Sequence, residues 1–206
     1  MLIIKSSPNS LNQKMKKIVR LLIASVFLLT AFSVNAGLIL SGSGSYGGSI
    51  YSVYKYDGSA DKTWDTAQLF ALGQGGYLAT LTTEAEDTFV TSLVQSLLGY
   101  HQEVWAGGYQ QDTSGGAANN WTWVNGEGPF GYKNWSLGEP NDYYGPNSEQ
   151  HLGINWTKNG TWNDEGDRGI GNIRGIVVES VPEPSVIALF AVGLLGLGFA
   201  SRKKRS

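Results

Sequence analysis

The alternation of apolar and polar side chains predicts several short strands. Residues 49–56 alternate with the period of a half-buried strand. Two shorter apolar runs, at residues 77–81 and 175–179, have the length and composition of buried strands. From residue 103 onward, the pattern offers only short strand candidates between long polar loops. Because long loops without structure of their own are uncommon unless they carry function, the segment 125–165 is where a site is expected.

Two segments instead have the signals of helices. Thr63 can cap a helix over residues 64–72, which the glycines that follow would end. Thr83 and Glu86 have the spacing of a capping box at the start of a second helix. Behind this box, one apolar stripe recurs at helical spacing, formed by Phe89, Val90, Leu93, Val94 and Leu97. The order of these elements predicts one small α+β domain over residues 50–180.

The amino-terminal segment, residues 1–36, has the pattern of a secretory signal peptide. Basic residues precede an apolar run at 21–32, and small residues follow at 34–36. A transmembrane anchor is the alternative, but this run is shorter than the roughly 20 residues that a span requires. Export is therefore expected, with a mature chain that starts near residue 37. The Gly- and Ser-rich segment 37–49 is expected to be a flexible lead-in to the domain.

The carboxy-terminal segment, residues 181–206, resembles the PEP-CTERM sorting signal of Gram-negative bacteria. Val181-Pro182-Glu183-Pro184 precedes an uncharged apolar helix at 185–200, and a cluster of Arg and Lys follows. The resemblance implies recognition by an exosortase and transient anchoring in the inner membrane through this helix. It also implies later release to the cell surface or the extracellular matrix. A permanent single-pass anchor is the alternative.

Charge and cysteine content narrow the chemistry of the domain. The chain of 206 residues contains no Cys, which excludes disulfides, thiolate metal sites and a Cys nucleophile. The basic residues gather at the two ends, so residues 37–180 carry six bases against sixteen acids, a net charge of −10. This acidic body argues against nucleic-acid binding and favours divalent cations.

One constellation of acids and amides stands out within the long polar loops. Glu139-Pro140-Asn141 is followed by Glu149 and then by Asn163-Asp164. Their carboxylate and amide oxygens are the hard ligands that Ca²⁺ prefers, and several side chains from two loops can hold one ion. Glu165 and Asp167, just beyond them, are expected in a solvated loop, with a role in tuning the site as the alternative for either residue.

Several motifs in fixed order resemble those of a C-type lectin-like domain. They are GGYLATL at 75–81, VWAGG at 104–108, WTWVNG at 121–126, YKNW at 132–135, GEPN at 138–141 and WND at 162–164. The resemblance covers residues 50–180 and implies an α+β fold with two helices, small antiparallel sheets and a long calcium-binding loop. Trp105, Trp121 and Trp123 are expected in the core rather than at a sugar.

The resemblance also implies the residues of a site. Ca²⁺ would be ligated by Glu139, Asn141, Glu149, Asn163 and Asp164. The first four of these would also form hydrogen bonds with two adjacent sugar hydroxyls. The Glu-Pro-Asn form of the motif implies equatorial hydroxyls of the mannose or glucose type.

The chain departs from the family pattern at three places. His151 and Asn172 stand in stretches where the family usually has Cys, and His151 is expected to be a structural replacement. The loop 142–148 is longer than in the animal sugar-binding members, which makes Glu149 the least secure of the ligands. A second calcium site would need an acid where this chain has Gln150.

These observations favour a secreted calcium-dependent carbohydrate-binding protein that acts at the cell surface or in an exopolysaccharide matrix. The alternative is a non-catalytic matrix or adhesion protein that uses the same fold for protein–protein contact. A hydrolase with paired carboxylates is a third hypothesis. Because the acids cluster with amides and no nucleophile–base pair is visible, the protein is not expected to be an enzyme.

Overall fold

The computed structural model describes residues 37–58, 60–168 and 170–182. The predicted signal peptide at 1–36 and the predicted apolar helix at 185–200 lie outside these residues. In the described ranges, no helix has the length and apolarity to cross a membrane. The elements are β1 (Leu38–Tyr46), β2 (Ser49–Tyr56), α2 (Trp64–Gly73), β3 (Tyr77–Leu78), α3 (Glu84–Leu98), β4 (Val104–Gln110), β5 (Trp121–Trp123), β6 (His151–Ile154), β7 (Asn163–Glu165) and β8 (Gly175–Ser180).

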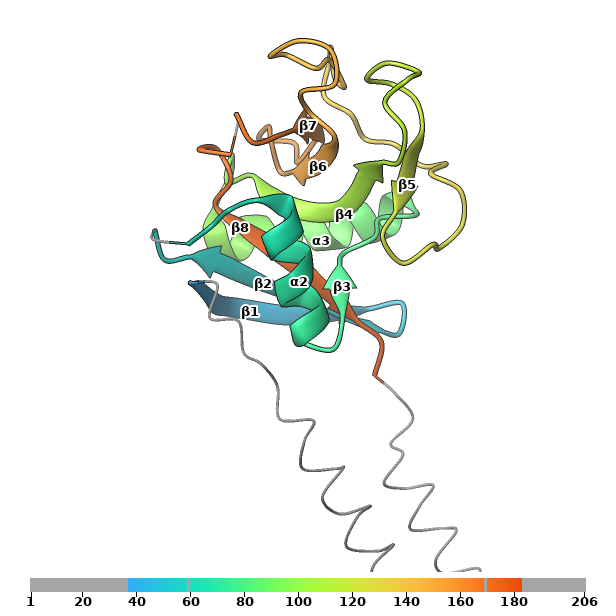
Figure 1. The fold of residues 1–206 in the computed structure, drawn as a ribbon. Helices are drawn as coiled ribbons and strands as arrows, with labels where there is room; N and C mark the ends of the chain where they lie inside the picture. Colours follow the sequence, from blue (N-terminus) through green and yellow to red (C-terminus); the bar gives the residue numbers. More distant parts are fainter. Residues whose placement is uncertain (1–36, 59, 169, 183–206) are drawn as a thin grey trace, which may run out of the picture. The chain divides into compact units, whose positions relative to one another are not determined.

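The strands form one connected sheet in the order β1-β2-β8-β4-β6-β7, with β3 on β8 and β5 on β4. All neighbours are antiparallel except β4 and β8, which pair in parallel. This parallel contact joins the β1-β2-β8 part of the sheet to the β4-β6-β7 part (Figure 1). The predicted α+β fold with two helices is confirmed.

The two helices cover opposite faces of the sheet. Strand β2 shows this, because its alternate residues point to opposite sides and pack against different helices. Tyr51 and Val53 pack in the cluster that contains Val90 and Val94 of α3. Tyr56 instead packs with Ala67, Phe70 and Ala71 of α2. The predicted core positions of Trp105, Trp121 and Trp123 are confirmed, since all three side chains are buried.

The expectation that residues 37–49 form a flexible lead-in is wrong. Residues 38–46 form strand β1, which pairs with β2 along its length. Two of the glycines that suggested flexibility, Gly42 and Gly44, lie directly beneath side chains of α3. A Cβ atom on Gly42 would lie 2.7 Å from Leu97 Cδ2, and one on Gly44 would lie 3.0 Å from Phe89 Cζ. Small residues in β1 therefore make room for the apolar stripe of α3.

Both helices begin where the sequence predicted, but the hydrogen bonds that cap them differ from the prediction. The Thr63 side chain makes no capping bond to α2; instead Asp61 accepts hydrogen bonds from Thr63 N and from Thr66 Oγ1. At α3, Thr83 Oγ1 accepts from Glu86 N at 3.2 Å, as a capping box requires. The Glu86 carboxylate reaches one residue further back and accepts from Thr82 N at 2.7 Å. Both helix starts are thus held by carboxylates.

A buried carboxylate on α3 ties this helix to the long loop. Asp87 is 2 % exposed, and its oxygens accept hydrogen bonds from Trp162 Nε1 at 2.9 Å, Tyr132 OH at 3.0 Å and Asn134 Nδ2 at 2.7 Å. Burial raises the pKa of Asp87, while these donors act in the opposite direction. Because all three donors belong to the chain between β5 and β7, Asp87 fixes the base of the loop segment against the helix.

The Asp87→Ala variant is expected to lower the free energy of unfolding by about 2–4 kcal/mol, because three buried donors would lose their acceptor. Urea denaturation followed by Trp fluorescence measures this change. The exposed Asp65 of α2 gives a matched control, and Asp65→Ala is expected to change stability by less than about 0.5 kcal/mol. Equal effects of the two substitutions would contradict the role assigned to Asp87.

Candidate functional site

The chain between β5 and β6 forms loops around the β6–β7 end of the sheet (Figure 1). Four of the predicted ligands, three from these loops and one from β7, line one hollow of about 380 Å³. These four are Glu139, Asn141, Glu149 and Asn163. The structure therefore brings together residues that lie up to 24 positions apart in the sequence.

Asp164, the fifth predicted ligand, is fully buried beside the hollow. Its carboxylate accepts hydrogen bonds from Asn141 N at 2.9 Å and from Asp142 N at 2.8 Å. The peptide bond between Glu139 and Pro140 is cis. Strand β7 thus supplies Asn163 to the hollow and, one residue later, the carboxylate that holds the Glu-Pro-Asn turn.

The longer loop after Asn141 is closed by Asp142. Its Oδ1 accepts hydrogen bonds from Ser148 N at 3.0 Å and Glu149 N at 3.1 Å, and its Oδ2 accepts from Asn147 N at 3.0 Å. This closure brings Glu149 back to the hollow, where its Oε2 accepts from Tyr143 N at 2.6 Å. The insertion therefore forms a compact turn and leaves Glu149, which is 3 % exposed, facing the other acids.

The acids of the hollow stand together without a basic partner. The pKa of Glu139 is raised to about 7, chiefly by burial and next by the neighbouring Asp164 carboxyl. Burial likewise raises the pKa of Glu149 to about 7, and it raises the pKa of Asp164. Within the described residues, none of the groups that act most strongly on these carboxyls is a Lys or Arg. A cation placed here would relieve both the burial and the mutual repulsion.

The donor set fits Ca²⁺ better than a metal that needs nitrogen or sulfur ligands. Glu139 Oε2 is buried and has no hydrogen-bond partner. In the described part of the chain, no group of three or more His, Asp or Glu side chains is arranged to hold an ion by itself. Glu139, Glu149 and Asp164 are therefore not arranged as a three-carboxylate site, and any coordination shell here would also have to use the amide oxygens of Asn141 and Asn163.

Two further residues of the hollow were not predicted from the sequence. Glu165, which was expected in a solvated loop, is instead the last residue of β7 and is 2 % exposed. It lines the hollow together with Asn172. Glu165 pairs with His151 of β6, and all three residues of β7 are buried. No local pattern in the sequence predicts this strand pairing. Aromatic side chains of Tyr143, Tyr144 and Trp156 line the same hollow and are partly exposed.

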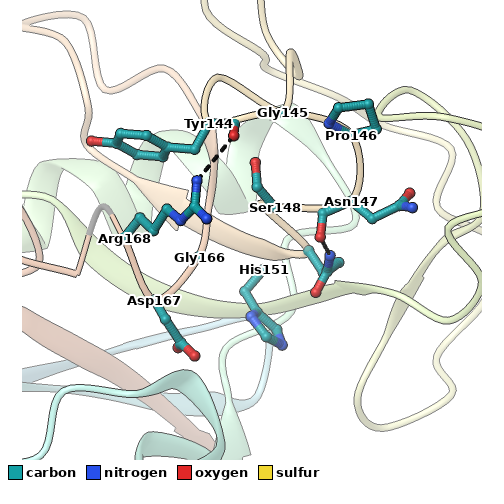
Figure 2. A pocket seen from close by; sticks show the side chains of 10 residues that line it. Tyr144, Gly145, Pro146, Asn147, Ser148, His151, Gly166, Asp167 and Arg168 are labelled. Carbon is teal, nitrogen blue, oxygen red and sulfur yellow. Dashed lines mark hydrogen bonds between the residues drawn. The ribbon is translucent and has the colours of Figure 1, made fainter.

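A second hollow of about 500 Å³ is lined in part by residues 144–148 of the same loop (Figure 2). Arg168 Nη1 donates to the Tyr144 carbonyl oxygen at 3.2 Å across it, and Asp167 lies nearby. The Gln150 side chain, which stands where a second calcium site would need an acid, donates to the Asn147 carbonyl oxygen. The Asp142 oxygens accept from backbone N–H groups of residues 147–149.

His151 lines the second hollow and has the environment of a packing residue. Its ring stacks on Trp64 with centroids 4.6 Å apart, and its edge faces Trp105. Burial lowers the pKa of His151 to about 4, so the ring is neutral at neutral pH. At the two positions where the family usually has Cys, this chain makes other contacts. His151 belongs to an aromatic stack, and Asn172 Nδ2 donates to Glu165 Oε1 at 3.5 Å.

Two helices, a small sheet and a long loop around an oxygen-rich hollow together define a C-type lectin fold. Residues 60–169 match the Lectin C-type domain, and the chain belongs to this family. Residues 180–205 match the PEP-CTERM protein-sorting motif. The order of motifs in the sequence therefore identified both parts of the chain.

Two animal proteins illustrate the similarity in sequence. Ladderlectin of Oncorhynchus mykiss is 33 % identical over 105 residues, which is 50 % of this chain and 50 % of that protein. The galactose-specific lectin nattectin of Thalassophryne nattereri is 30 % identical over 107 residues, which is 52 % of this chain and 61 % of that protein. The chain thus spans between half and about three fifths of the length of these relatives.

Solved structures show the same fold in proteins of different kinds. The C-type lectin CEL-I from Cucumaria echinata matches with a TM-score of 0.54 at 19 % identity, covering 66 % of this chain and 93 % of that one. Herring type II antifreeze protein matches with a TM-score of 0.53 at 18 % identity, covering 68 % and 97 %. The fold alone therefore does not decide the function, which has to be argued from the residues of the hollow.

The Asp142→Ala variant tests how the loop is held. Three backbone N–H groups would lose their acceptor, so amide hydrogen exchange at residues 147–149 is expected to become about tenfold faster or more. Mass-spectrometric exchange measures this change. Asp112 is the matched control, because it makes the same kind of bond to Ser114 in another exposed loop. Unchanged exchange at 147–149 in Asp142→Ala would show that the loop is held by other contacts.

Proposed function

We propose that this protein is a secreted carbohydrate-binding protein whose sugar binding depends on calcium. The observation that supports this most directly is the convergence of Glu139, Asn141, Glu149 and Asn163 on one acidic hollow. Calcium would be held by these four side chains and by Asp164. The bound ion supplies positive charge and free coordination positions, which two adjacent sugar hydroxyls can occupy.

The protein side chains would orient the sugar around this ion. Carboxylates of Glu139 and Glu149 would accept hydrogen bonds from hydroxyls, and amides of Asn141 and Asn163 would donate to them. Asn163 Nδ2 donates to Glu103 Oε1 and Glu165 Oε1 in this structure, so it would have to exchange these partners for a hydroxyl. The Glu-Pro-Asn order supports equatorial hydroxyls of the mannose or glucose type. The partly exposed rings of Tyr143, Tyr144 and Trp156 offer apolar surface to the C–H groups of a sugar. We assign no catalytic role to these residues.

The two ends of the chain support a location outside the cell. We propose that residues 1–36 direct export and that the segment after 180 is processed by an exosortase, after transient anchoring in the inner membrane. The binding domain would then act at the cell surface or in an exopolysaccharide matrix. Because β1 belongs to the sheet, we place the start of this domain at Leu38 instead of residue 50.

The alternative function is adhesion through protein–protein contact without sugar. One observation favours it: β1 lies at the edge of the sheet, and its Ile39 and Leu40 side chains are exposed. An exposed apolar edge strand can pair with another chain. Calcium dependence separates the two functions, since the edge strand lies apart from the acidic hollow in the sheet order.

Calcium is expected to raise the melting temperature of the purified protein by several degrees relative to EGTA. An ion that binds only the folded state stabilises it by about 2.7 kcal/mol at 100 times its Kd. Differential scanning calorimetry measures the shift, and equimolar magnesium controls for ionic strength. The Glu139→Gln variant should lose most of the shift. An identical melting temperature in calcium and EGTA would remove the calcium site from the proposal.

Exchanging the acid and the amide of the Glu-Pro-Asn turn is expected to change sugar recognition. The double variant Glu139→Gln with Asn141→Asp keeps one acid and one amide, so calcium binding should persist. Donor and acceptor positions are swapped, and each unpaired group costs about 1–3 kcal/mol. The wild type should therefore bind mannose- or glucose-type ligands in calcium, and the double variant should lose them. A glycan array with and without calcium measures both.

The Asn163→Ala variant completes this test, because it should lose calcium and sugar together. If the double variant binds the wild-type sugar unchanged, the contact lies elsewhere. If the wild type binds calcium but no glycan, carbohydrate recognition is excluded and the adhesion function is favoured.

A further inference from the structure

The second hollow, of about 500 Å³, takes no part in the proposed calcium site (Figure 2). None of the five predicted calcium ligands lines it. It nevertheless adjoins the acidic hollow, because Tyr144 belongs to the lining of both. A ligand longer than one sugar residue, held at the acidic hollow, would therefore reach the second hollow along the same loop.

The two hollows differ in charge. Acids line the first, and its lining contains no Lys or Arg. The lining of the second contains Arg168, which is one of only six bases in residues 37–180. A ligand that extends over both hollows would therefore meet acids, or the ion that they hold, at one place and a guanidinium at the next.

The Arg168 side chain is held in position, but its charge is not paired. Its Nη1 donates to Tyr144 O at 3.2 Å, and it forms no ion pair with an acid of the described residues. The neighbouring Asp167 points away from the guanidinium in Figure 2. Burial lowers the pKa of His151, and the Asp167 carboxylate opposes that shift, so Asp167 acts on His151 instead. Because an Arg carries five N–H donors, four remain for a ligand.

A hydroxyl of the same hollow also lacks a partner. Ser148 Oγ is buried and makes no hydrogen bond within the described part of the chain. Ser148 N donates to Gly145 O at 3.1 Å, so this residue is held at the same turn as the Arg168 guanidinium. Figure 2 shows both side chains directed at this turn. A buried hydroxyl without a partner is costly, and an oxyanion that accepts from it and from the guanidinium would satisfy both groups.

We infer that the second hollow is a subsite for an anionic substituent of a polysaccharide, next to the sugar held by calcium. This inference rests on the proposed sugar site and names its class of ligand, a polysaccharide that carries carboxylate or sulfate groups. Arg168 binds the anion, because a planar guanidinium presents parallel N–H groups to two oxygens of a carboxylate or sulfate. Ser148 donates to the same anion. An uncharged polysaccharide leaves both groups without a partner.

Matched oligosaccharides test this inference on the full-length protein in calcium. Isothermal calorimetry compares neutral tetrasaccharides of glucose and of mannose with two anionic forms of each. In one form the primary hydroxymethyl groups are oxidised to carboxylates, and in the other they carry sulfate esters. At least one anionic form is expected to bind about tenfold more tightly than the neutral form, and high salt should reduce this gain. The two forms show which anion the subsite takes.

Substitutions assign the gain to the second hollow. Arg168→Gln should abolish it and leave the affinity for the neutral tetrasaccharide within about twofold of the wild type. Ser148→Ala should reduce the gain by about threefold, because one hydrogen bond to the anion is lost. Arg174→Gln is the matched control and should change nothing. Arg174 is also exposed, and its guanidinium also donates to a carbonyl oxygen, that of Gly171.

The outcomes separate this subsite from the sugar site. If neutral and anionic forms bind the wild type equally, the inference fails and the sugar site stands. If Arg168→Gln weakens both forms alike, Arg168 acts only through the loop, and the inference fails. If no form binds in calcium, the proposed sugar site fails and the inference fails with it. Circular dichroism checks that each variant is folded. Should Arg168→Gln not fold, Ser148→Ala and the salt dependence carry the same expectation.

Discussion

The position of the whole candidate site depends on Trp162. Its ring is fully buried, and its Nε1 donates to Asp87 of α3. Its backbone is bonded on both sides to the long loop, through Asn134 O at 2.8 Å and Ser136 N at 2.8 Å. Rings of Trp123, Phe130, Tyr132 and Trp135 surround it, each inclined steeply to its plane. Because Asn163 and Asp164 follow directly, the ligands are held by aromatic packing in a chain that has no disulfide to hold them.

The acids of this end of the molecule are placed mainly by backbone and amide N–H groups. Asp142 closes its loop and Asp164 holds the Glu-Pro-Asn turn, in both cases by accepting from main-chain N–H groups. Hydrogen bonds of this kind fix a carboxylate in place without neutralising it. The fold therefore concentrates negative charge where an ion can compensate it, and the surrounding packing keeps that charge in place.

The sequence predicted best those features that depend on local pattern. Strand β2 and helix α3 follow from alternation and from an apolar stripe, and the site motifs follow from their order along the chain. The Gly-rich composition of residues 37–49 predicted a flexible lead-in where the structure has β1. A sequence does not distinguish glycines that pack beneath Leu97 and Phe89 from glycines of a linker. The burial of Glu165 and the approach of Glu103 to Asn163 could not be predicted either. Both depend on which strands become neighbours, and two of these strands are only three or four residues long.

Gly153 of β6 has a consequence for how this protein can change over evolutionary time. It is the position that admits the buried Glu103 side chain, and a larger residue there would collide with the carboxylate. A larger residue at 153 would force the Glu103 side chain out of this position, so it would be accepted most easily beside a shorter residue at 103. Among homologues, the two positions should therefore covary. A glycine at 153 paired with an acid at 103 should mark the members that keep a buried carboxylate at this place.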